Sequence, residues 1–149
     1  MSAHSLKRFH DAQKDKYAGY EVALQEMRSG CKVSHWIWYI FPQLKGLGMS
    51  DMADYYGIDG LQEAQDYMAD KVLRKRLIEI STVLLNIEGK SAAEILGYID
   101  AIKVRSSMTL FAEAVPEEPI FTEVLKKYYH GEKDEKTLGL LGLLKEISR

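Results

Sequence analysis

The stretch 34–43 is the part of this chain that most suggests chemistry, and it reads Ser-His-Trp-Ile-Trp-Tyr-Ile-Phe-Pro-Gln. It holds both tryptophans of the protein, together with His35 and Gln43. A stretch of core would lack these two polar side chains, and a solvated loop would not carry so many aromatic rings. Aromatic surface with a few polar atoms is typical of a pocket wall. We therefore expect this aromatic segment to line a pocket in which Trp36 or Trp38 stacks on a planar group.

A second group of reactive side chains lies in residues 100–109, which read Asp-Ala-Ile-Lys-Val-Arg-Ser-Ser-Met-Thr. Lys103, Ser106 and Ser107 are three and four residues apart, so they share one face of a helix. Arginine donates two parallel hydrogen bonds to a phosphate or carboxylate, and hydroxyl groups add short ones. We expect Lys103 and Arg105 to hold an anion. The alternative is a solvated helix face whose hydroxyls bond back to the helix.

Three side chains of the aromatic segment have a structural alternative beside the functional one. His35 has the right chemistry to carry a proton near neutral pH if the site performs a reaction. A histidine among aromatic rings is otherwise a packed residue with one satisfied nitrogen. Gln43 either contacts the ligand or ties down the turn at Gly46–Gly48. Trp36 and its neighbours are either pocket wall, plain core or both.

Charge and composition exclude several classes of function. The 149 residues include 20 basic and 22 acidic side chains and carry a net charge of −2, whereas a general nucleic-acid binder shows a strong basic excess. No apolar run is long enough to cross a bilayer. Cys31 is the single cysteine, so no intrachain disulfide can form, and the first residues are polar, unlike a secretory signal. We expect a soluble cytoplasmic protein without nucleic-acid or membrane binding; its oligomeric state carries no sequence signal.

Familiar cofactor motifs are missing, so we expect no cofactor and no metal. Gly46-Leu47-Gly48 lacks the third glycine and the preceding strand of a dinucleotide fingerprint. Gly89-Lys90-Ser91 lacks the upstream glycine of a phosphate-binding loop. The four histidines do not have the spacing of metal ligands. The expected ligand is a small anionic molecule, phosphorylated or nucleotide-like.

Apolar residues recur at helical spacing along almost the whole chain. The clearest stripe lies within 72–87 and consists of Leu73, Leu77, Ile80, Leu84 and Ile87. A helix is expected to begin soon after Asp15, and Ser91 with Glu94 has the spacing of a capping box. No segment alternates apolar and polar residues, although a short β pair could form near 36–41. We predict a mainly α fold: a single multihelical, orthogonal-type domain over residues 1–149, with about seven to nine helices and little or no β.

Several motifs, taken together, resemble the bacterial domain-of-unknown-function family 1810, whose members are often mislabelled as calpastatin in genomes. The matching blocks include Arg8-Phe9 with Ala12-Gln13, residues 34–43, Gly46-Leu47-Gly48, and the stretch from Asp100 through Lys103 to Phe111. The resemblance covers nearly the whole chain. It implies a mostly helical single domain and no established activity. Lys71 and Arg74 stand where the family often has Pro and Gly, so this turn is expected to be more helical here.

The resemblance marks the same two segments as the chemical argument, and together they define one predicted site. Its members are Arg8, Gln13, His35, Trp36, Gln43, Lys103, Arg105, Ser106 and Ser107. The rival hypothesis is a non-enzymatic interaction or stress-related module. In that case the aromatic segment is a patch that binds a partner protein, because Trp, Tyr and Arg are enriched at interface anchors.

Overall fold

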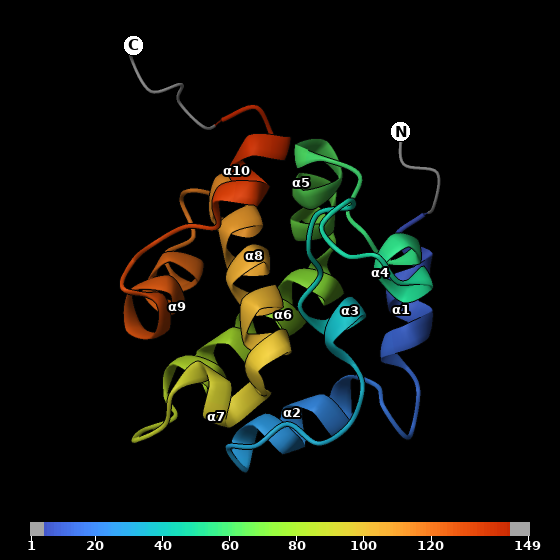
Figure 1. Ribbon diagram of the computed structural model, residues 1–149. Helices are drawn as coiled ribbons and strands as arrows, with labels where there is room; N and C mark the ends of the chain where they lie inside the picture. Colours follow the sequence, from blue (N-terminus) through green and yellow to red (C-terminus); the bar gives the residue numbers. More distant parts are fainter. Residues whose placement is uncertain (1–4, 144–149) are drawn as a thin grey trace.

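The computed structural model describes residues 5–143, which form ten helices and no strand (Figure 1). The mainly α prediction is confirmed. The helices are α1 (Lys7–Gln13), α2 (Tyr20–Arg28), α3 (Ile37–Ile40), α4 (Asp51–Tyr55), α5 (Leu61–Ala69), α6 (Lys71–Leu85), α7 (Ala92–Leu96), α8 (Tyr98–Ala114), α9 (Ile120–Tyr129) and α10 (Glu135–Leu140). The described residues thus contain one helix more than the upper end of the expected seven to nine, and α3, α4 and α7 are short, with four or five residues each.

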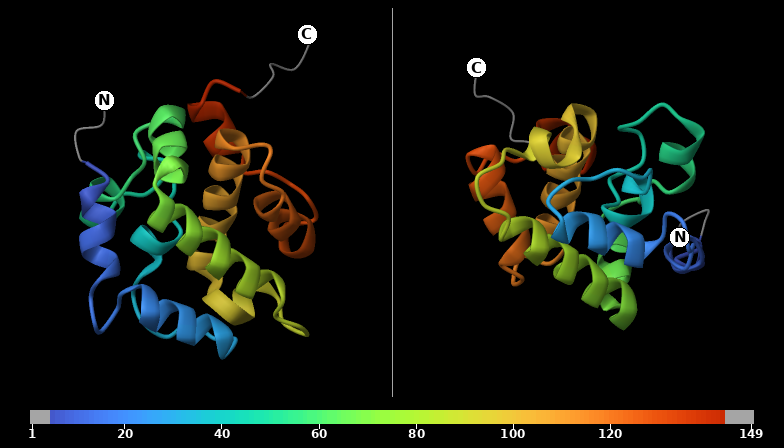
Figure 2. Two further views of the ribbon diagram at one scale, coloured as in Figure 1. Left: turned by 180° about the vertical axis from the view of Figure 1, so that it is seen from behind. Right: turned by 90° about the horizontal axis from the view of Figure 1, so that it is seen from below.

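Helix α8 is the central element of the fold. From Ser106 to Ala112 every residue is buried, so this half of the helix is covered on all sides. It packs against α5, α7, α9 and α10, and the Phe111 ring lies 5.2 Å from that of Tyr67 and 5.8 Å from that of Phe121. The views from behind and below show α6 crossing the back of the molecule with α2 beside it (Figure 2).

Within the aromatic segment, Ile37–Ile40 form the short helix α3 rather than a β pair, and the Trp38 ring of α3 lies 5.4 Å from the Lys103 ammonium of α8. Lys32, just before the segment, forms an ion pair with Asp100 in the first turn of α8. Farther along, Gly46 lies against Leu140 of α10, which covers the last turns of α8. Segments distant in the sequence therefore meet along one side of the central helix.

Helix α2 begins five residues later than the sequence suggested. The carboxylate of Asp15 accepts hydrogen bonds from the backbone nitrogens of Tyr17 and Ala18, at 3.0 and 2.7 Å, and makes a turn. Gly19 then passes so close to this turn that a Cβ there would lie 2.1 Å from the Asp15 carbonyl oxygen. The hydrogen bonds of the Asp15 side chain therefore favour a turn where the apolar pattern predicted helix, and Tyr17 is exposed.

Other local predictions are confirmed. Helix α6 runs through Lys71 and Arg74 without a break, and the Asp70 carboxylate caps it by accepting from two backbone nitrogens. Ser91 and Glu94 form the expected capping box at the start of α7. Gly97, at a φ of +87°, separates α7 from α8, a conformation that favours glycine. In the described part of the chain no helix is long and apolar enough to cross a membrane.

Candidate functional site

Glu26 of α2 holds the start of the aromatic segment in place. Its carboxylate accepts hydrogen bonds from the backbone nitrogens of Val33 and Ser34 at 2.8 and 2.9 Å, from Ser34 Oγ at 2.6 Å and from Trp36 Nε1 at 2.9 Å. Burial alone would raise the pKa of Glu26, but these hydrogen bonds outweigh it and lower the pKa to about 2. The carboxylate is therefore charged at neutral pH, and it fixes the indole of Trp36.

Most rings of the aromatic segment belong to the core. The side chains of Trp36, Tyr39 and Phe41 are all buried, and burial raises the pKa of Tyr39 to about 12. Trp38 differs, because it is only partly buried and its ring faces α8. The prediction left open which tryptophan packs and which faces outward; the fold puts Trp36 inside and Trp38 at the edge.

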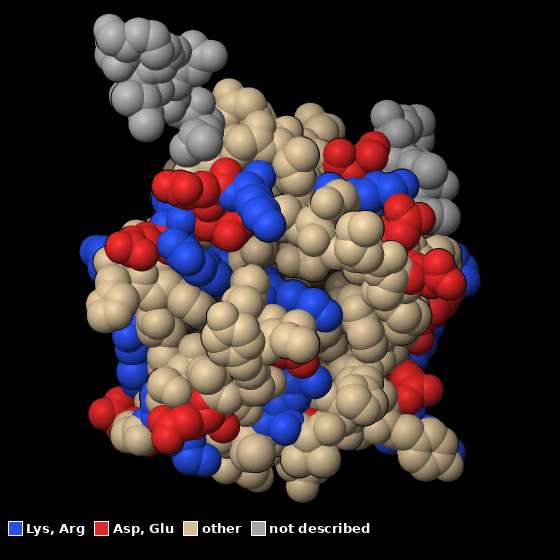
Figure 3. Space-filling model, in the orientation of Figure 1, with Lys and Arg blue, Asp and Glu red and all other residues tan. Residues whose placement is uncertain are grey.

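A connected series of ion pairs and cation–π contacts joins the aromatic segment to α8. The Asp100 carboxylate lies 2.9 Å from Lys32 Nζ and 3.7 Å from Lys103 Nζ. The Lys32 ammonium stands 4.8 Å from the centre of a Trp36 ring, and that of Lys103 5.4 Å from Trp38. Both distances are within the range of cation–π attraction. In the space-filling view, basic side chains lie in the middle of this face, between the positions of α8 and α3 (Figure 3).

Two buried polar atoms next to this chain of contacts have no hydrogen-bond partner in the described residues: Trp38 Nε1 and Ser107 Oγ. Ser107 lies one helical turn beyond Lys103, on the same face of α8. Buried polar groups are nearly always paired, and leaving one unpaired costs about 1–3 kcal/mol. Ser107 is fully buried, whereas Trp38 is partly exposed, so of these two residues only Trp38 reaches the surface.

His35 and Gln43 lie at the border of this region. The side chain of His35 is exposed, and its ring makes no hydrogen bond within residues 5–143, while its carbonyl accepts one from Tyr39 Oη at 3.3 Å. Gln43 lines a cavity of about 10 Å³ together with Trp38 and Tyr56. A cavity of that size holds at most one water molecule, so a ligand-sized pocket is not shown there.

Two predicted site residues near the N-terminus have partners elsewhere. The buried Arg8 guanidinium pairs with both carboxylate oxygens of Glu63, at 3.0 and 3.3 Å, and donates to the Gly57 carbonyl oxygen at 3.0 Å. Gln13 is also buried; its amide nitrogen donates to the Tyr39 carbonyl oxygen at 2.8 Å, and its oxygen accepts from Arg76 at 3.1 Å. Both side chains tie α1 to other parts of the fold.

Two predicted residues of α8 also make contacts that hold the fold together. Arg105 donates to the carbonyl oxygens of Glu132 and Lys133, at 2.9 and 3.0 Å, and so fastens the loop before α10. Ser106 Oγ donates to the Ile102 carbonyl oxygen at 3.3 Å, the back-bonding that was the alternative for this helix. The fold thus brings Lys103 to Trp38, and it turns Arg105 away toward α10.

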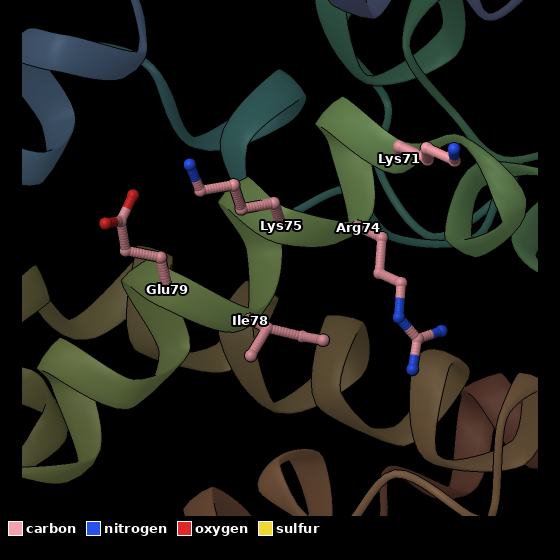
Figure 4. Close-up of a pocket in the computed structure, with 5 residues that line it drawn as sticks. All are labelled: Lys71, Arg74, Lys75, Ile78 and Glu79. Carbon is pink, nitrogen blue, oxygen red and sulfur yellow. The ribbon is translucent and has the colours of Figure 1, made fainter.

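A larger hollow lies on the outer face of α6 and was not anticipated. It has a volume of about 460 Å³ and is lined by Lys71, Arg74, Lys75, Ile78 and Glu79 (Figure 4). Arg74 pairs with Glu118 at 3.4 Å, and Glu79 accepts from Tyr20, so part of this lining is already engaged. The only feature of the sequence that points to this hollow is the presence of four basic residues within 71–76. Among the described residues no group of His, Cys, Asp and Glu could hold a metal ion.

Comparison with known proteins agrees with the residue pattern. Residues 3–141 match the model of a family described as "Protein of unknown function (DUF1810)". The chain belongs to this family. A solved structure of similar fold, that of the conserved hypothetical protein Rv1873 from Mycobacterium tuberculosis, is 43% identical in sequence. Its crystal structure superposes with a TM-score of 0.89 over 93% of this chain and 97% of that one. A comparison with curated proteins found no match.

Proposed function

We propose that this protein binds a small anionic ligand, phosphorylated or nucleotide-like, against Trp38 and Lys103. The observation that carries the proposal is the Lys103 ammonium, which stands 5.4 Å from the Trp38 ring centre and, within residues 5–143, has one ion pair, with Asp100 at 3.7 Å. The Lys103 side chain is 24% exposed, and such a cation beside an aromatic face offers an anion a charge and a planar group a surface.

A hydrogen-bond donor beside Lys103 supports this assignment. Trp38 Nε1 has no partner within the described residues and is a donor only, so it suits an oxygen of a phosphate or carboxylate. His35 and Gln43 border the same region, and His35 would carry the proton in any reaction. We assign Arg8, Gln13, Trp36, Arg105 and Ser106 to the framework, because other parts of the chain engage them.

A thermal-shift screen against nucleotides, sugar phosphates and inorganic anions tests the proposal. A ligand at a hundred times its dissociation constant stabilises the fold by about 2.7 kcal/mol, which raises the Tm of a chain of this size by roughly 5–10 °C. The shift should disappear in Lys103→Met and remain in Lys75→Met, a matched control on the far helix α6. A screen without any shift, or a shift that survives in Lys103→Met, would contradict the proposal.

The alternative is an interaction module, and one observation favours it. The first turns of α8 expose Tyr98, Ile99 and Ile102, at 75, 66 and 49%. Because the aromatic rings of residues 34–43 are largely buried, a docking patch for a partner polypeptide would be at these three residues instead. A photoreactive side chain at position 98 would then crosslink a partner in cells, and the product should be lost in Ile99→Lys. An unchanged product would count against this patch.

A further inference from the structure

Asp100 occupies a special place in the first turn of α8. One carboxylate oxygen lies 2.9 Å from Lys32 Nζ and the other 3.7 Å from Lys103 Nζ, and its side chain is only 19% exposed. A single negative charge therefore lies between two ammonium groups, each of which covers one indole ring. Without it, the two cations would repel each other over a short distance.

The two lysines depend on Asp100 to different degrees. Lys32 is nearly buried, and its ammonium also donates to the Ser34 carbonyl oxygen at 2.6 Å. Within residues 5–143, the Lys103 ammonium contacts only the Asp100 carboxylate and the Trp38 ring. A lysine side chain loses much rotamer freedom when it is held in one place, so a partner must offset that loss. For Lys103, Asp100 is the charged partner.

We propose that Asp100 is a positioning residue, which holds Lys103 over Trp38 so that the ammonium is ready for an anionic ligand. The inference rests on the proposed function, because it concerns the same site. Two ammonium groups and one carboxylate leave a net charge of about +1 there. The cluster therefore still attracts an anion, while Asp100 holds the two cations in place. Asp100 itself does not touch the ligand.

A purely structural role for Asp100 makes a different prediction. The ion pair with Lys32 ties the chain before α3 to α8, and Lys32→Met removes this tie while it leaves Asp100 beside Lys103. Asp100→Asn removes the negative charge that pairs with both lysines. The two variants therefore separate positioning of Lys103 from attachment of the aromatic segment. Asp100→Glu serves as the conservative replacement.

The first readout needs no ligand. The protein has two tryptophans, hence two indole N–H signals in a ¹H–¹⁵N spectrum, and loss of one in Trp38→Phe identifies Trp38. Asp100→Asn should move the Trp38 signal in the same direction as Lys103→Met and by at least half as much. Lys32→Met should move the Trp36 signal instead, and Asp100→Glu should restore most of the native position. A Trp38 signal that stays unchanged in Asp100→Asn overturns the proposal.

The second readout is titration with inorganic phosphate, followed by the same signals. Asp100→Asn should weaken phosphate binding by about five- to tenfold, and Lys32→Met by less than twofold. Equal weakening in both variants would mean that Asp100 acts only by attaching the segment. If phosphate moves no signal in the unaltered protein, the proposed function fails for this anion, while the ligand-free spectra still decide the role of Asp100.

Discussion

Glu26→Gln should destabilise the protein and uncouple the aromatic segment from α2. The carboxylate accepts four hydrogen bonds from Val33, Ser34 and Trp36, and an amide offers only one oxygen in their place. Together these contacts lower the pKa of Glu26 from 4.5 to about 2. At 1.36 kcal/mol for each pKa unit, the preference for the charged form is about 3 kcal/mol. Because the carboxylate is partly open to solvent, screening reduces the expected loss to about 1–2 kcal/mol.

The pH dependence of this loss follows from the direction of the pKa change. A carboxylate whose pKa is lowered by folding contributes its full stability above pH 4.5, and the contribution disappears as pH falls toward 2. The difference in unfolding free energy between native protein and Glu26→Gln should therefore be constant from pH 8 to pH 6. It should shrink steadily between pH 4.5 and pH 2.

Urea unfolding at a series of pH values, followed by tryptophan fluorescence, measures this difference. At pH 7 the loss corresponds to a fall in Tm of roughly 2–8 °C. Glu117→Gln is the matched control, because Glu117 is exposed and makes no hydrogen bond within the described residues. A difference that is the same at pH 7 and pH 2.5 would refute the electrostatic argument, and so would equal effects of the two substitutions.

Three further substitutions test the framework around the site. Arg8→Met leaves Glu63 buried without its partner and should cost about 3–5 kcal/mol in urea unfolding, and the double substitution with Glu63→Met should recover part of that loss. Arg105→Ala should lower stability by about 1 kcal/mol without changing any anion-induced shift in Tm; loss of that shift would place the guanidinium at the ligand after all. Gly19→Ala should lower Tm by several degrees, because its Cβ would collide with the Asp15 carbonyl oxygen, and an unchanged Tm would argue against this tight turn.

Local features of the sequence were sufficient to predict most helices. The buried stripe of α6 and the capping box of Ser91 with Glu94 depend on residues three or four apart, so a one-dimensional pattern contains them. Where a different local signal competed, as at Asp15, the apolar pattern alone was misleading. The fold class and the family followed from this local information together with the motifs.

For the predicted site residues, the local pattern was less informative than it was for the helices. Chemistry and spacing singled out the two segments, and the fold brings Lys103 of one to Trp38 of the other, but neither chemistry nor spacing could say which side chains pair within the fold. Arg8 finds Glu63, 55 residues away, and Gln13 finds Arg76, 63 residues away. Only tertiary packing decides such partners, since they come from separate helices.

The sequence by itself therefore determined a helical chain with aromatic and cationic groups in two segments. The tertiary structure decided that Trp36 lies in the core and Trp38 at its edge, and that Lys103 lies beside Trp38 while Arg105 binds the loop before α10. It also placed Asp100 between Lys32 and Lys103, which come from different segments of the chain. The physical reason is that the hydrogen bonds and ion pairs which engage a polar side chain depend on three-dimensional neighbours, whereas helix formation depends mainly on near ones.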